Sequence, residues 1–162
     1  MRNINTVDHW SHAYRREGEY SWLTYPKCFK LIQEIKGIDL SDVAINLCKK
    51  KFPAMFSAAM IPPIPEETDS YDWIIATEFL EHFNFPDKVL AECVRVAPNA
   101  IFSVPDDMLN NQECPEHYQC FNKQSLKNLL GKYYENVKII HFIDEFNKIC
   151  LPTMLAVCEG RE

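Results

Sequence analysis

Glycine and long apolar runs are both scarce in this sequence. Only 4 of its 162 residues are glycine, and none lies between Gly18 and Gly37. That part of the chain therefore lacks a glycine-rich turn, which lets a backbone approach a phosphate or nucleoside closely. No segment approaches the roughly 20 apolar residues of a membrane span, and the N-terminus lacks the apolar run of a signal peptide. We expect no membrane partner and a cytoplasmic location.

Positive charge is also in short supply. The chain has 17 Lys and Arg against 23 Asp and Glu, a formal net charge of −6. The one basic run, 49–51, falls at the end of an expected helix, where solvation and the helix dipole account for it. Because a nucleic-acid backbone requires clustered cations, we expect no nucleic-acid partner.

The seven cysteines are odd in number, and most lie within apolar patterns, as Cys48 and Cys93 do. This favours free buried thiols over disulfides. Cys114, His117 and Cys120 have spacings that could ligate zinc, but a fourth ligand is not evident and the spacing differs from paired CxxC motifs. We predict no metal site.

Beyond residue 36, short apolar runs alternate with helical periodicity. The pattern predicts strands at 37–40, 55–60, 71–76, 100–104, 137–143 and 154–158. One helix is predicted to follow the cap Ser41 and to end before Pro53. A second begins at Pro86 and stops at Pro98. A third follows the cap Asn122 and ends after Leu130.

Alternating strands and helices, followed by an antiparallel pair, indicate an α/β fold with an open sheet. Right-handed crossovers would gather the strand C-termini at one edge, where ligands bind. The strand at 71–76 is continuously apolar after Asp72, which predicts cover on both faces. The segment DEFNKICLPT (144–153) is expected to be the loop between the last two strands.

Three blocks carry a family likeness: GIDLSDVAINLCKKKFP (37–53), YDWIIATEFLEHFNFPDKVLAECVRVAPNAIFSVPDD (71–107) and PEHYQCFNKQSLKNLL (115–130). Together they resemble the class I S-adenosylmethionine-dependent methyltransferases, particularly the small-molecule type labelled type 11. The likeness implies a Rossmann-like open sheet of about six to seven strands, mostly parallel with an antiparallel C-terminal strand. It also implies a single domain over 1–162, with an N-terminal helical region (1–36) and an α/β core (37–162).

The resemblance implies S-adenosylmethionine as cofactor and gives Asp39 a role. A carboxylate where a strand meets a helix can accept two hydrogen bonds from ribose hydroxyls. The alternative is that Asp39 stabilises the N-terminus of the helix that Ser41 caps; the later blocks favour the ribose role. The other cofactor-binding positions that the resemblance implies are Leu40, Ala59, Met60, Thr77 and Glu78.

His82 and His117 are the candidate catalytic residues. His82 could act as a base or contact the substrate, and would share a helical face with Glu78. His117 falls in the loop after the fifth strand of the family pattern, where a structural role is the alternative. For Glu81 we expect a capping or surface role. Since the sulfonium is an activated donor, positioning can supply most of the catalysis.

The pattern breaks at two places. The only candidate for the family's first strand is 20–25 (YSWLTY), and 26–28 (PKC) then stand where the family has GxGxG; otherwise the strand is absent. Proline removes an N–H donor, and each of the three residues carries a Cβ. Ala58 and Ala59 replace the family's adenine-binding Asp.

We therefore predict a methyltransferase that uses S-adenosylmethionine and acts on a small-molecule acceptor. Two alternatives remain open. One is a catalytically inactive methyltransferase fold that serves as a binding or scaffolding subunit, with a homodimer as one form. The other is an internally deleted form of an ordinary methyltransferase.

Overall fold

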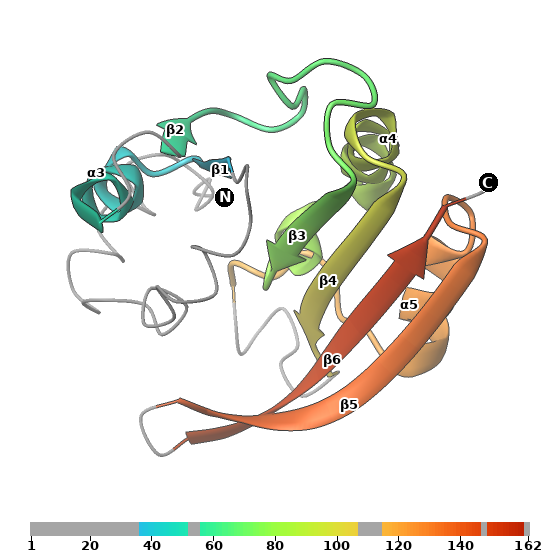
Figure 1. Ribbon diagram of the computed structural model, residues 1–162. Coiled ribbons are helices and arrows are strands. Elements are labelled where there is room, and N and C mark those ends of the chain that lie inside the picture. The colour runs from blue at the N-terminus through green and yellow to red at the C-terminus, as the bar shows by residue number, and fades with distance from the viewer. Residues whose placement is uncertain (1–35, 52–55, 107–114, 147–148, 161–162) are drawn as a thin grey trace. The chain divides into compact units, whose positions relative to one another are not determined.

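The computed structural model describes residues 36–51, 56–106, 115–146 and 149–160 (Figure 1). The expected strand at 20–25, the N-terminal helical region and Cys114 lie outside these ranges. The described residues belong to two compact units that divide after Ile61. Within the described residues, no helix has the length and apolar character that a membrane crossing requires.

The first unit contains a strand–helix–strand segment. Strands β1 (Gly37–Asp39) and β2 (Phe56–Ala58) pair in parallel, and α3 (Asp42–Lys51) connects them. The Ser41 hydroxyl accepts a hydrogen bond from the Ala44 N–H at 3.3 Å, which confirms the predicted cap. The helix buries the predicted face, formed by Ala44, Ile45 and Cys48.

The second unit contains a four-stranded sheet. Its strands are β3 (Trp73–Thr77), β4 (Asn99–Pro105), β5 (Asn136–Phe146) and β6 (Ile149–Glu159), in the order β3-β4-β6-β5. Figure 1 shows the four side by side. The β3–β4 pair is parallel, whereas β4–β6 and β5–β6 are antiparallel. The α/β class and the antiparallel C-terminal pair are therefore confirmed.

The loop predicted at 144–153 is wrong, because most of it is strand. Antiparallel pairing continues from Ile143 opposite Pro152 to Phe146 opposite Ile149. Pro152 has no N–H to donate, but its carbonyl accepts a hydrogen bond from the Asp106 N–H at 3.0 Å. That bond helps to keep Pro152 within the sheet.

The prediction that both faces of the third strand are covered is also wrong. β3 lies at one end of the strand order, and its exposure alternates along its length. Trp73 is 43% exposed and Ile75 is 66% exposed, so one face of this strand is largely open. A continuous apolar run does not distinguish a strand buried on both faces from one whose apolar side chains meet solvent.

Two helices and one short turn complete the second unit. Helix α4 (Pro86–Val96) buries the predicted stripe Val89, Leu90, Cys93 and Val96, and the 3-10 helix η2 (Leu80–His82) follows β3. Helix α5 (Lys123–Leu130) begins at Asn122, whose side chain forms a reciprocal capping box with Ser125. These elements bury the core side chains Leu80, Leu90, Phe102, Val104, Leu126, Leu130 and Met154.

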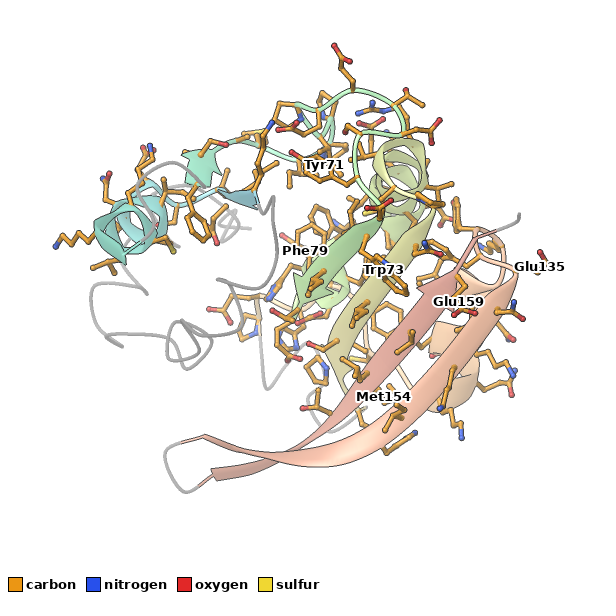
Figure 2. The ribbon with its side chains drawn as sticks, in the orientation of Figure 1. Tyr71, Trp73, Phe79, Glu135, Met154 and Glu159 are labelled. Carbon is orange, nitrogen blue, oxygen red and sulfur yellow. The ribbon has the colours of Figure 1, made fainter. Side chains whose placement is uncertain are left out.

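A guanidinium fork fixes the proline-rich loop that precedes β3. Arg95 Nε and Nη2 donate to the two carboxylate oxygens of Glu92 at 2.9 and 2.8 Å. Its Nη1 and Nη2 also donate to the backbone carbonyls of Glu66 and Ile64, at 2.8 and 2.9 Å. Tyr71, labelled in Figure 2, donates its hydroxyl to the Glu66 carboxylate at 3.2 Å. The loop is thus held to α4 by charge-assisted hydrogen bonds.

We predict that Leu126→Ala lowers the free energy of unfolding by about 2–5 kcal/mol, because it leaves a cavity beneath α5. Leu126 is fully buried, whereas Leu129 on the same helix is only partly buried. Leu129→Ala should therefore cost roughly 1 kcal/mol. Urea unfolding followed by circular dichroism measures both, and equal losses would contradict the packing described for α5.

Candidate functional site

The candidate site begins where the two parallel strands end. Thr77 at the end of β3 pairs with Ser103 of β4, so both chains leave the sheet at the same edge. Glu78 then adopts a positive φ of 48°, which is uncommon for a residue other than glycine. Its N–H donates to the Ser103 carbonyl at 2.9 Å and to the Ser103 hydroxyl at 3.0 Å. That hydroxyl in turn donates to the Glu78 carboxylate at 2.9 Å, which holds this turn in place.

The turn leads directly into η2. Phe79, labelled in Figure 2, packs edge-on against Phe83 with ring centroids 4.7 Å apart. Because η2 begins at Leu80, Glu78 lies outside the helical turn. The prediction that Glu78 and His82 share a helical face is therefore wrong.

Glu81 is buried rather than on the surface, so the predicted surface role is wrong. Its side chain is 1% exposed. Its backbone carbonyl accepts hydrogen bonds from the Tyr118 and Gln119 N–H groups at 2.7 and 3.0 Å. Among the described residues, neither carboxyl oxygen of Glu81 has a hydrogen-bond partner. Burial, and secondarily the negative charge of Glu78, raises the pKa of Glu81 well above its ordinary value.

Two imidazoles stand beside this carboxyl group. His82 Nδ1 lies 3.0 Å from the Glu116 carbonyl oxygen and donates to it, so Nε2 is the unprotonated nitrogen of the neutral ring. That Nε2 is 3.6 Å from Glu81 Oε1. The His82 and His117 rings meet edge to face with centroids 5.0 Å apart. Burial lowers the pKa of both histidines, which favours neutral imidazoles near neutral pH.

The structure thus brings together both predicted catalytic residues and adds Glu81 and Ser103, which sequence reasoning missed. For Ser103, the available signal was its place as the polar residue of a buried strand. For Glu81 there was little signal in the sequence, because the residues that it contacts, around Tyr118, are far away along the chain.

The predicted ribose ligand lies in the first unit. Asp39 Oδ1 accepts the Ser41 N–H at 2.7 Å, so the alternative, local role at the start of α3 is present. Beside it, the Ala59 N–H donates to the Asp39 carbonyl at 3.1 Å, and Met60 is 71% exposed. Because Thr77 and the residues after it belong to the second unit, the predicted cradle between the two segments stays a prediction.

Comparisons with known proteins give a consistent family and fold. A family model described as a methyltransferase domain matches residues 20–103, just over half of the chain. Among curated protein sequences, none matches significantly. Among solved structures, the YcgJ protein from Bacillus subtilis is 15% identical, with a TM-score of 0.63 and coverage of 87% of each chain.

Two further solved structures have the same fold. A SAM-dependent methyltransferase from Thermotoga maritima is 15% identical, with a TM-score of 0.61, and the match covers 97% of this chain and 96% of that one. The N-terminal domain of EvdMO1, solved with SAH bound, is 13% identical, with a TM-score of 0.56 and coverage of 79% of this chain and 65% of that one. At such identities the likeness shows the methyltransferase Rossmann-like fold alone.

The buried carboxyl group predicts a pH-dependent effect of Glu81→Gln. A carboxyl group whose pKa is raised by folding stabilises the fold while protonated, and this contribution is lost as the pH rises through the raised pKa. From pH 4.5, the ordinary value, towards neutrality, the variant should gain stability relative to the wild type. Urea unfolding at several pH values, with EDTA present, measures the difference.

The matched control is Glu67→Gln, at an exposed position in the loop before β3. It should leave the pH profile of the wild type unchanged. If the difference in the free energy of unfolding between Glu81→Gln and the wild type did not change with pH, the raised pKa of Glu81 would be contradicted.

Proposed function

Because this chain belongs to the methyltransferase domain family, within the class I S-adenosylmethionine-dependent methyltransferases, we propose that it transfers a methyl group from S-adenosylmethionine to a small-molecule acceptor. The observation that carries the proposal is the turn after β3, which Ser103 fixes and from which the His82 ring meets the ring of His117. It lies at the C-terminal edge of parallel strands, where ligands of open α/β sheets bind.

Each unit by itself carries some of the residues proposed to bind the cofactor. Asp39 accepts hydrogen bonds from the ribose hydroxyls, in addition to the one from the Ser41 N–H. Leu40, Ala59 and Met60 border the adenosine, and Thr77 and Glu78 border the methionine end. The binding of SAH by the related EvdMO1 domain supports this cofactor class.

The acceptor half of the proposed site is the histidine pair. His82 Nε2 is the ring nitrogen that takes up a substrate proton, because Nδ1–H is committed to the Glu116 carbonyl. His117 would contact the acceptor beside it. Both groups need only to orient the acceptor and, where the attacking atom carries a proton, remove it, since the sulfonium already activates the methyl group.

The alternative from a different functional class is a non-catalytic binding subunit. The open face of β3, with Trp73 and Ile75, favours it, because exposed apolar side chains are typical of interaction surfaces. The lack of the family's glycines favours it too, whether residues 26–28 stand in their place or the first strand is absent. An internally deleted form of an ordinary methyltransferase would have the same features.

We predict that S-adenosylmethionine binds the purified full chain and that Asp39→Asn weakens this binding by roughly tenfold or more. A lost charge-assisted hydrogen bond costs about 1.5–3 kcal/mol, and about 1.4 kcal/mol corresponds to tenfold. Asparagine keeps one side-chain oxygen for the Ser41 N–H, so the turn survives. Isothermal titration calorimetry measures the affinity.

Asp42→Asn is the control, since Asp42 has the same charge in the first turn of α3 but an exposed position. It should bind as the wild type does. No heat of binding at millimolar S-adenosylmethionine would overturn the proposal. Formation of S-adenosylhomocysteine by the purified chain with a panel of small acceptors would eliminate the non-catalytic alternative.

A further inference from the structure

The carboxyl group of Glu81 has no hydrogen-bond partner among the described residues, although it is almost completely buried. Its side chain is 1% exposed, and neither oxygen is hydrogen-bonded. Leaving a buried polar group unsatisfied costs roughly 1–3 kcal/mol, and more for a charge. Such groups are rare in folded proteins, where bound ions or water molecules commonly satisfy them. The Glu81 carboxyl group is therefore suited to a partner other than the described residues.

Three metal-binding side chains converge at this point. One donor atom from each of Glu81, His82 and His117 lies within 4.8 Å of the other two, and His82 Nε2 is 3.6 Å from Glu81 Oε1. In a tetrahedral site with bonds of about 2.0–2.1 Å, donor atoms are about 3.3–3.4 Å apart. Side-chain movements of about an ångström would therefore complete such a site.

The orientation of His82 matches that of a metal ligand. Metal-binding histidines almost always donate their second ring N–H to a carbonyl or carboxylate, which fixes the tautomer. Here Nδ1 donates to the Glu116 carbonyl, and Nε2 faces Glu81. A neutral imidazole is the form that binds a metal, and the Nδ1 hydrogen bond leaves Nε2 as the acceptor nitrogen of the neutral His82 ring.

We propose that Glu81, His82 and His117 form a binding site for one divalent transition-metal ion. Two imidazole nitrogens and one carboxylate oxygen suit Zn²⁺, Mn²⁺ or Fe²⁺, and leave coordination positions open for an external ligand. The negative charge of the nearby Glu78 adds to the attraction for a cation.

The site lies wholly within the second unit, and its three ligands come from η2 and from the segment before α5. It therefore does not depend on cofactor binding, but the metal ion and a substrate proton compete for the same atom, His82 Nε2. Among the described residues the cluster contains no cysteine, since Cys120 is exposed and is not one of the converging ligands; Cys114 lies outside the described ranges.

The test is a Co²⁺ titration of the full chain after EDTA treatment and buffer exchange, followed by absorption spectroscopy. We expect one equivalent to bind, with visible d–d bands and without the near-ultraviolet charge-transfer band of a cobalt–thiolate bond. Zn²⁺ should displace it. Glu81→Gln and His117→Ala should each weaken Co²⁺ binding by more than roughly tenfold, because each removes one of three ligands.

The control is His141→Ala, which removes an exposed imidazole that pairs with Asp106 at 2.9 Å and does not belong to the cluster. It should bind Co²⁺ as the wild type does. If Glu81→Gln fails to fold, electron–nuclear double resonance of the Mn²⁺-loaded wild type replaces it, and two nitrogen couplings are expected.

Three results would overturn the proposal. They are the absence of stoichiometric binding, a thiolate charge-transfer band, and unchanged affinity in folded Glu81→Gln and His117→Ala. All are measured without S-adenosylmethionine. Failure of the metal site can therefore be distinguished from failure of the proposed methyl transfer. As a further control, Asp39→Asn alters the other unit and should leave Co²⁺ binding unchanged.

Discussion

One backbone carbonyl, that of Glu81, joins the two parts of the candidate site. It accepts hydrogen bonds from two consecutive N–H groups, of Tyr118 and Gln119. These bonds tie the segment that follows β4 to the turn that follows β3. Because they lie beside a buried side chain, they act where the local dielectric constant is low and hydrogen bonds are strong. His117 directly precedes the donors, so its ring is carried to His82.

The second constraint is the conformation at Glu78. A positive φ is unfavourable for this residue, and such strain persists only where the surroundings over-determine it. Here Ser103 supplies the surroundings, by accepting from the Glu78 N–H and donating to its carboxylate. Hydrogen bonds within the protein therefore fix this turn, and His82 follows it directly.

Much of the fold was predictable from local patterns. Apolar periodicity and proline placed α4, and Asn122 and Gly131 marked the two ends of α5. What failed depends on partners distant in the sequence. The open face of β3 depends on which elements pack on that face of the sheet, and the length of β5 and β6 reflects pairing that continues past Pro152.

The candidate site was predictable in part, for the same reason. His82 and His117 could be chosen because both follow strands, where polar side chains collect in open α/β sheets. The burial of Glu81 could not, since an acidic residue in a short turn is ordinarily solvated. The segment whose N–H groups bond to the Glu81 carbonyl, at Tyr118 and Gln119, lies far away in the sequence.

The hydrogen bonds between Arg95 and Glu92 affect which substitutions the loop before β3 tolerates. Arg95 also donates hydrogen bonds to the backbone carbonyls of Ile64 and Glu66 in this loop. Every amino acid has such a carbonyl group. Substitutions in this loop can therefore accumulate while its path is retained, provided that the two helix residues persist. Relatives of this chain should vary at the exposed positions of the loop and keep the Arg95–Glu92 pair, which lies on the helix and not in the loop.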